Sequence, residues 1–379
     1  MIFQETEDHS MIRETAKSFA QKEILPHAAE WDEQARFPQE ALKKMSELGF
    51  MGMMVPPEFG GSGFDIFSYL IALEEICVAC PSTGGTMSVH NSLFCGVLNR
   101  FGSEELKKKY LPSFASGEKL GAYCLSEPGT GSDAANQQTT AKREGDFYIL
   151  NGTKNFITSG PHAHGLLIFA MTDKAKRHKG ISLFLVEKNF PGFGVGKIEK
   201  KMGLKASSTS SIILDNCRVP AKNRIGEEGE GFSIAMKGLD DGRLGIATQA
   251  LAISRAAFEA ALRYIKEREA FGKKISEFQA IQWMLADSAT RIDASRLLIM
   301  KAAALRSQGK PYTKEAAQAK LYASETSNFV TNKALQMHGG YGYCQDYPAE
   351  RHLRDARVTE IYEGTSEIQR LVIAREILK

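Results

Sequence analysis

Residues 147–158, Phe-Tyr-Ile-Leu-Asn-Gly-Thr-Lys-Asn-Phe-Ile-Thr, contain two short runs of aromatic and β-branched residues on either side of Asn151-Gly152. Such runs are typical of strands, and Asn-Gly is a frequent hairpin turn. Similar runs follow at 166–171, 181–186 and 211–214. No helical pattern separates them, so this region predicts an antiparallel barrel or sandwich rather than a doubly wound parallel sheet.

Helical patterns flank the β region on both sides. Before it, apolar residues recur at helical spacing in residues 40–48, and Ser103 stands where an N-cap would begin a helix. After it, residues 244–265 and 281–299 each carry a long apolar face. The sequence therefore predicts an α+β fold in three parts: a helical N-terminal domain (1–120), a middle antiparallel β-barrel domain (121–231) and a C-terminal four-helix bundle (232–379).

Length and composition exclude several classes of protein. The 379 residues suit two or three domains, and 43% apolar with 25% charged residues excludes disordered, collagen-like and disulfide-stapled chains. No run approaches the roughly 18 apolar residues of a membrane span, and the acidic N-terminus resembles neither an export signal nor a transit peptide. We expect a soluble protein, cytoplasmic or a mature matrix form, with neither membrane nor nucleic acid among its partners.

The net charge of +3 conceals an uneven distribution along the chain. Residues 1–120 contain 11 Lys and Arg against 17 Asp and Glu, whereas residues 121–379 contain 37 against 28. This excess of positive charge in the later part favours anionic ligands there.

Metal and common nucleotide motifs are missing. Cys77 and Cys80 form a C-x-x-C pair within an apolar helical pattern, without a second pair at zinc spacing, so we interpret both as core residues of a protein in a reducing compartment. His162 and His164 lack a third ligand nearby and indicate a polar loop. The chain contains neither a P-loop motif nor a G-x-G-x-x-G opening a helix after a strand. No metal is expected.

Three segments can carry chemistry. Residues 123–133 combine glycines with hydroxyl side chains, which suits a loop around a phosphate or a polar ring edge, or simply a turn. Residues 336–342 combine an amide, a glycine pair and aromatic residues, and an interhelical turn is again the alternative. In the third segment, Ser366 and Gln369 predict a capping box that places Glu363 just before a helix. That carboxylate is either a favourable charge at a helix N-terminus or a general base.

Taken in order, these segments resemble the acyl-CoA dehydrogenase family over essentially the whole chain. The matching motifs include residues 26–29, 55–61, 126–133, 151–158, 201–204, 268–272, 336–355 and 361–366. The resemblance implies a homotetramer, a dimer of dimers, with one FAD per subunit. It also implies the activity of fatty-acid β-oxidation, namely α,β-dehydrogenation of an acyl-CoA thioester to the trans-2-enoyl-CoA, with an electron-transferring flavoprotein as electron acceptor.

Glu363 matches the base of the family, which removes the α-proton while a hydride passes to flavin N5. An α-C–H beside a thioester is a very weak acid, so the forming enolate must be stabilised by hydrogen bonds. The family uses the backbone N–H at the position of Glu363 together with a flavin ribityl hydroxyl. Burial beside apolar acyl carbons is expected to raise the pKa of Glu363.

The resemblance also assigns the residues of the two binding sites. Those expected to contact the flavin and its ribityl chain are Tyr123, Leu125, Ser126, Gly131, Ser132, Phe156 and Thr158. Those expected to reach the pyrophosphate and adenine from a neighbouring subunit are Arg268, Phe271, Gln279, Gln336, Gly339 and Gly340. Thr365 and Glu367 complete the FAD site. Residues expected to hold the acyl-CoA are Ser132, Asp240, Arg243, Gly364 and Arg375. From spacing alone, Asp240 and Arg243 read as an exposed helical ion pair, and Ser276 with Gln279 as a capping box.

Two departures from the family pattern bear on function. Many relatives carry Trp where this chain has Phe156, and some carry their base at the place of Gly242, which leaves Glu363 as the candidate here. Residues 207–209, 349–352 and 360–370 look most like the short-chain and short-branched-chain members. We expect a short-chain acyl-CoA dehydrogenase, linear or branched; the alternatives are a dehydrogenase for a cyclic acyl-CoA, an acyl-CoA oxidase, or a non-catalytic flavin or acyl-CoA binding scaffold.

Overall fold

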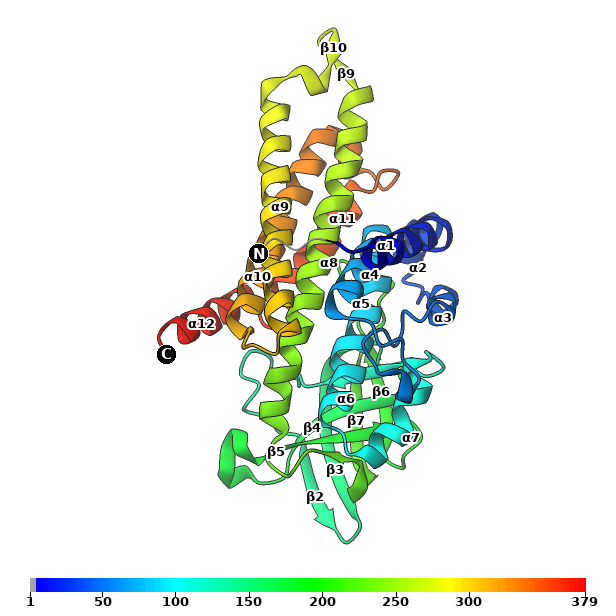
Figure 1. The fold of residues 1–379 in the computed structure, drawn as a ribbon, viewed down its shortest axis with the longest axis vertical. Coiled ribbons are helices and arrows are strands. Elements are labelled where there is room, and N and C mark those ends of the chain that lie inside the picture. Colours follow the sequence, from blue (N-terminus) through cyan, green and yellow to red (C-terminus); the bar gives the residue numbers. More distant parts are fainter. Residues whose placement is uncertain (1–4) are drawn as a thin grey trace.

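Helices precede and follow a single large sheet in the computed structural model, which describes residues 5–379 (Figure 1). The N-terminal helices are α1 (Glu7–Phe19), α2 (Ala28–Gln34), α3 (Gln39–Glu47), α4 (Ile66–Ala79), α5 (Pro81–Ser88), α6 (Gly96–Phe101) and α7 (Glu104–Ala115). A π-helical segment, Val89–Cys95, joins α5 to α6. The N-cap predicted at Ser103 is confirmed, because its hydroxyl accepts a hydrogen bond from the Leu106 N–H at 3.3 Å.

The middle of the chain forms the sheet. Its strands are β1 (Gly121–Cys124), β2 (Thr140–Glu144), β3 (Phe147–Thr158), β4 (Gly165–Met171), β5 (Ile181–Glu187), β6 (Phe193–Ile198), β7 (Thr209–Pro220) and β8 (Arg224–Ile225). Hydrogen bonds join them in the order β6-β7-β3-β2-β4-β5-β8, with β1 beside β4. The expectation of a purely antiparallel barrel is corrected, because β4 pairs in parallel with both β1 and β2 and the order has two open ends. The long connection from β1 through the β2–β3 hairpin supplies the crossover that parallel pairing needs.

The predicted turn at Asn151-Gly152 is wrong. β3 runs through it without interruption, and the hairpin turn lies instead between Glu144 and Phe147. Both halves of β3 pair with β7, and Gly152, at φ 147°, absorbs a register shift where the chain passes close to Thr139. A second register shift between Lys154 and Ile157 leaves Phe156 at a φ of 56° and 65% exposed.

Long helices form the C-terminal part: α8 (Gly231–Glu267), α9 (Gln279–Ser307) and α10 (Thr313–His338), with the shorter α11 (Ala349–Arg357) and α12 (Ser366–Ile377). A small hairpin, β9 (Glu269–Ala270) and β10 (Lys273–Lys274), joins α8 to α9 at the end of the molecule opposite β2 and β3 (Figure 1). α11 packs against α8 and α10, and α12 packs against α10. The α+β order of helices, sheet and helices is therefore confirmed. None of the described helices combines the length and apolar character that crossing a membrane requires.

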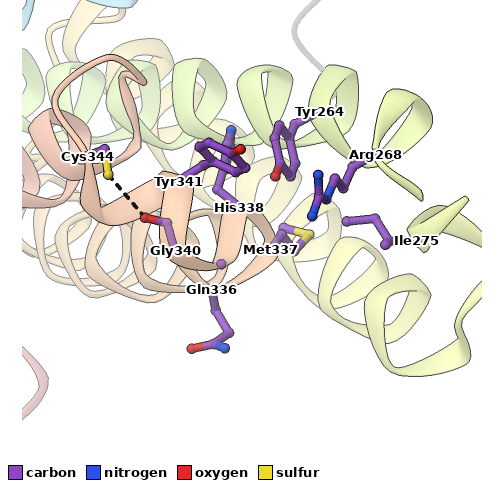
Figure 2. Close-up of a pocket in the computed structure, with 10 residues that line it drawn as sticks. Tyr264, Arg268, Ile275, Gln336, Met337, His338, Gly340, Tyr341 and Cys344 are labelled. Carbon is purple, nitrogen blue, oxygen red and sulfur yellow. Dashed lines mark hydrogen bonds between the residues drawn. The ribbon is translucent and has the colours of Figure 1, made fainter. Parts of the chain in front are cut away.

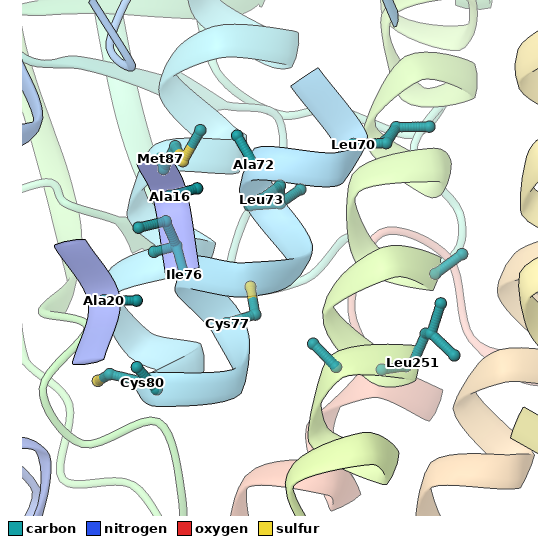
Figure 3. Close-up of a cluster of buried hydrophobic side chains, with 14 of the residues drawn as sticks. Ala16, Ala20, Leu70, Ala72, Leu73, Ile76, Cys77, Cys80, Met87 and Leu251 are labelled. Carbon is teal, nitrogen blue, oxygen red and sulfur yellow. The ribbon is translucent and has the colours of Figure 1, made fainter. Parts of the chain in front are cut away.

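Shared cores join the three parts. Figure 3 shows side chains of α1, α4 and α5, such as Ala16, Ile76 and Met87, in one cluster with Leu251 of α8. Further towards the start of α8, Ile234 belongs to a second core, which includes residues of β4 and β5. Because α8 contributes to both cores, it lies at the junction of all three parts.

Two paired glycines let the N-terminal helices approach the sheet. Gly121 and Gly165 are directly opposite each other in the β1–β4 register. A Cβ on Gly121 would overlap the ring of Phe94, and one on Gly165 would lie 2.7 Å from the ring of Phe114. The two rings, 4.4 Å apart between centroids, therefore pack on bare backbone.

A buried ion pair holds the loop after β1. Lys154 of β3 is 0% exposed, and its Nζ lies 2.8 Å from the Glu127 carboxylate. That carboxylate also accepts the N–H groups of Gln138 and Thr139 at 2.6 and 3.0 Å. Burial raises the pKa of Glu127, but Lys154 and these hydrogen bonds more than offset it and hold the pKa below its ordinary value.

We predict that Glu127→Gln destabilises the protein. It leaves the Lys154 ammonium buried without a carboxylate, which costs about 3 kcal/mol. The midpoint of thermal unfolding is expected to fall by several degrees, and adding Lys154→Met is expected to restore much of the loss. Glu144→Gln, which removes an exposed ion pair with Lys142, is the matched control with no expected effect. An unchanged midpoint for Glu127→Gln would contradict the prediction.

Candidate active site

Glu363 lies on a sharp turn between α11 and α12. Glu363 and Gly364 both have positive φ values, 51° and 94°, and a non-glycine residue in this region stores strain that neighbouring contacts must offset. The Gly364 carbonyl accepts hydrogen bonds from Lys320 Nζ at 2.7 Å and from Gln369 Nε2 at 2.9 Å. On the other side of Glu363, the Tyr362 hydroxyl donates to Gln249 Oε1 of α8. The turn is therefore tied to α8, α10 and α12.

The N-cap of α12 is one residue earlier than predicted. The hydroxyl of Thr365, not of Ser366, accepts the Ile368 N–H at 3.3 Å. Gln369 is therefore no capping-box partner and instead donates to the carbonyls of Glu363 and Gly364. Glu363 precedes a helix, as expected.

The Glu363 carboxylate fills the space that a side chain on Gly242 would occupy. A Cβ on Gly242 would overlap Glu363 Oε2 and lie 2.9 Å from Leu93 Cδ2. The absent side chain in the middle of α8 and the carboxylate from the C-terminal turn are thus complementary. Only glycine at position 242 leaves this room.

Burial changes the acidity of the Glu363 carboxyl group. Its Oε2 is buried and has no hydrogen-bond partner among residues 5–379. Burial raises the pKa of Glu363 to about 7, although the positive charges of Lys320 and Arg243 lower it. A carboxyl group that titrates near neutral pH is suited to act as a base there.

Groups from all three parts of the chain surround Glu363. Tyr69 of α4 and Tyr123 of β1 are buried and Tyr362 is half-buried, and burial together with the nearby Glu363 charge raises the pKa of each phenol. The Tyr123 hydroxyl donates to the Ala235 carbonyl of α8 at 3.3 Å. These phenols therefore stay neutral and add no competing charge beside the carboxylate.

Asp240 and Arg243 form a buried ion pair, so the exposed pair read from spacing alone is wrong. Arg243 Nη1 lies 2.6 Å from Asp240 Oδ1, and Arg243 is 4% exposed. Thr313, at the start of α10, donates to the other Asp240 oxygen at 2.6 Å. Arg243 Nε is buried and has no partner among the described residues, which leaves one cationic donor available for a ligand.

The loop after β1 presents open backbone and hydroxyl groups. Glu127 and Thr130 exchange backbone hydrogen bonds at 2.9 and 3.1 Å, which closes the loop, while the backbone carbonyl of Ser126 accepts the Asn155 N–H at 2.9 Å. An added Cβ on Gly131 would meet nothing within 4 Å, and Ser132 is exposed. Leu125 and Thr158 are half-buried beside this loop and β3. Together with the exposed ring of Phe156, the loop suits a flat ligand with a polar edge.

A second group of predicted residues lies at the far end of α8. Arg268, Gln336, Gly339 and Gly340 line a cavity of about 500 Å³, together with His338 and Tyr341 (Figure 2). The Arg268 guanidinium lies 5.6 Å from the centre of the Tyr341 ring. The Gln336 side chain points away from both of these side chains (Figure 2). Phe271, at the hairpin tip, is 96% exposed. Gln279 is exposed at the start of α9, where no side chain caps the helix, so the Ser276–Gln279 capping box is wrong.

The chain does not bring the two groups together. Gly242, which faces Glu363, and Arg268 are 26 residues apart, about 39 Å along a helix axis. Glu367 is exposed in the first turn of α12, and Arg375 is exposed near the end of that helix. Glu363, Gly364, Thr365, Asp240 and Arg243 lie in one region.

Sequence reasoning missed Gln249 and Lys320, which hold this region, and assigned Gln369 to a capping box only. Each is buried, and each makes its contact to a segment distant in sequence or to the turn itself. Lys320 had a detectable signal, since it interrupts a face of buried alanines on α10.

The sulfur and histidine residues play structural parts. Cys77 and Cys80 are buried free thiols, as interpreted. His162 stacks on Phe37, and His164 accepts the Leu120 N–H at 3.1 Å. Within residues 5–379 no cluster of three or more His, Cys, Asp or Glu side chains could hold a metal ion.

Known protein families and a curated relative match this chain along essentially its whole length. Three domain families match: acyl-CoA dehydrogenase N-terminal domain at residues 6–118, middle domain at 122–217 and C-terminal domain at 229–378. The short-chain specific acyl-CoA dehydrogenase of Clostridium acetobutylicum is 50% identical over 379 residues, which covers 100% of both chains.

Two solved structures are also similar. One, described as an electron-transferring flavoprotein of Acidaminococcus fermentans, superposes with a TM-score of 0.99 at 49% identity and covers 100% of both chains. The other, a glutaryl-CoA dehydrogenase from Mycobacterium smegmatis in complex with FADH2, has a TM-score of 0.93 at 32% identity and covers 98% of this chain and 95% of its own. The chain therefore belongs to the acyl-CoA dehydrogenase family.

Proposed function

We propose that this enzyme dehydrogenates a short-chain acyl-CoA between Cα and Cβ, with Glu363 as the base. One observation carries the proposal: a carboxylate with a buried, unpartnered oxygen occupies the gap at Gly242. The short-chain specific relative at 50% identity supports the substrate class.

The residues present fit FAD, the cofactor of this family. The exposed Phe156 ring offers an apolar face, and the open backbone at Gly131 with the exposed Ser132 offers polar contacts to a ring edge. We assign Leu125, Ser126, Thr158, Thr365 and Glu367 to the same site, with Tyr123 supporting it from the core. Bound FAD supplies the acceptor for the β-hydride.

Each residue around Glu363 has a proposed task. Glu363 takes the α-proton, and its backbone N–H stabilises the thioester oxygen as negative charge develops there. The buried Arg243, held by Asp240, orients the acyl-CoA through its free Nε. Gly364 gives the acyl group close access, and Ser132 and Arg375 contact the more distant parts of coenzyme A.

The FAD site is proposed to be shared between copies of this chain. The residues expected at the pyrophosphate and adenine lie around the end of α8, about 39 Å along the helix from Gly242, which is too far to reach a dinucleotide beside their own Glu363. They are Arg268, Phe271, Gln279, Gln336, Gly339 and Gly340. We propose that they bind the pyrophosphate and adenine of a neighbouring subunit within a homotetramer. An electron-transferring flavoprotein is the proposed electron acceptor, in keeping with the similar structure from Acidaminococcus fermentans.

Glu363→Gln is expected to abolish the reaction while retaining FAD. The amide cannot accept the α-proton, so bleaching of the flavin by butyryl-CoA is expected to slow by at least about a thousandfold. Anaerobic stopped-flow absorbance measures it. Thermal unfolding and the oxidised flavin spectrum serve as controls for the fold, and unchanged reduction kinetics would reject Glu363 as the base.

Gly242→Ala is expected to impair the reaction without removing any polar group. The added methyl group displaces the Glu363 carboxylate, so we expect a loss of at least about tenfold in the flavin reduction rate. Gly194→Ala in β6, where a Cβ makes only ordinary contact, is the matched control. Equal rates for the two variants would contradict the importance of this gap.

A shared FAD site makes a testable prediction for mixed oligomers. Phe156→Ala and Arg268→Ala are each expected to lower flavin content, because each damages one half of every site. In oligomers containing both variants, some sites combine two intact halves, so flavin content is expected to rise above that of either variant. Differently tagged chains, co-purified and measured by flavin absorbance, provide the test. No recovery on mixing would show that both halves come from one chain.

A further inference from the structure

We infer that Lys320 is a positioning residue for the base: its buried Nζ holds the Gly364 carbonyl, and its charge favours the ionised form of Glu363. This inference rests on the proposed role of Glu363. It assigns a function to a group that the reaction chemistry does not otherwise require.

Lys320 is buried and binds a backbone carbonyl instead of a carboxylate. Lys320 is 0% exposed on α10, and its Nζ donates to the Gly364 carbonyl at 2.7 Å. Among residues 5–379 no carboxylate oxygen lies within 4.0 Å of it, unlike the buried Lys154, which has Glu127. Its hydrogen bond is therefore directed to the turn that carries Glu363.

Burying such a charge is unfavourable, so its presence needs a reason. The same face of α10 is formed by Ala316, Ala319 and Ala323, all buried, where an apolar side chain would pack without a desolvation cost. Burial lowers the pKa of Lys320 to about 8, while the nearby Glu363 charge raises it again in part. The ammonium thus remains mostly charged near pH 7.

Lys320 is the cation beside Glu363 that lacks a close carboxylate partner. The charged and titratable groups facing Glu363 are Lys320 from α10, Arg243 from α8, Tyr69 from α4, Tyr123 from β1 and Tyr362 from its own turn. Asp240 is paired with Arg243, whereas Glu360 and Glu367 face Lys320 only from beyond ion-pair distance. Lys320 therefore offsets the burial of Glu363, and removing it makes the carboxylate harder to ionise.

The test isolates proton removal from flavin reduction. Acetyl-CoA has an α-C–H but no β-carbon, so the holoenzyme can exchange its α-hydrogens with D2O without oxidising it. Mass spectrometry follows this exchange from pH 5.5 to 9. For Lys320→Met we expect the rising acid limb to move to higher pH by about one unit, which lowers exchange about tenfold on that limb, while flavin content is retained.

Two further variants separate the hydrogen bond that Lys320 donates from the positive charge that it carries. Lys320→Gln keeps a donor and loses the charge, so it is expected to show the same pH shift; Lys320→Arg is expected to restore the parent profile largely. Lys333→Met, on the same helix, is the matched control with no shift. If Lys320→Met does not fold, the Gln and Arg variants make the same comparison.

Two different results would separate a failure of the Lys320 inference from a failure of the proposed role of Glu363. A uniform loss of exchange at all pH values, with the acid limb unmoved, would overturn the inference and leave Lys320 a packing residue. Exchange that survives in Glu363→Gln would instead reject Glu363 as the base, and with it the proposed function.

Discussion

The packing around α8 constrains the whole molecule. Every residue from Asp240 to Ser254 is buried, so this helix meets neighbours on all sides. Close approach requires missing side chains: a Cβ on Gly238 would lie 2.8 Å from Val97, one on Gly245 would overlap the Ser88 hydroxyl, and one on Gly242 would overlap the Glu363 carboxylate. The N-terminal helices and the C-terminal turn reach one helix because it is narrow at these places. A rigid, fully packed helix of this kind makes a precise support for a reacting group.

The electrostatics at Glu363 balance two opposing effects. Burial disfavours the carboxylate, whereas Lys320 and Arg243 favour it, and the result is a pKa near 7 instead of a permanently protonated acid. The two cations differ in their surroundings, because Arg243 is paired with Asp240 and Lys320 is directed to a backbone carbonyl. The same turn is held by Gln249 through Tyr362 and by Gln369, so its left-handed backbone is fixed from several elements.

The local sequence pattern predicted the type and order of the helices and strands correctly, but it was less reliable for turns and helix caps. Alternating and helical periodicities located the β region and the long helices, because burial of one face imposes these periods on any sequence. The turn at Asn151-Gly152 was wrong because β7 pairs with both halves of β3, and that pairing outweighs a local turn preference. The cap predicted at Ser366 was wrong because the hydroxyl of Thr365, one residue earlier, accepts the N–H group at the start of α12 instead. The cap predicted at Ser276 was wrong because no side chain caps the start of α9.

Sequence alone was enough to identify the family, the three-part order and Glu363 as the candidate base, because these depend on residue types at nearly constant spacing. It also revealed the excess of positive charge after residue 120, to which Arg243, Arg268 and Arg375 belong. The fit of the carboxylate into the Gly242 gap, the bond from Lys320 to Gly364 and the separation of Arg268 from Glu363 became visible only in the folded chain. These pairs of residues are 44 to 121 positions apart in the chain, and no local rule of helix or strand formation specifies which distant surfaces meet.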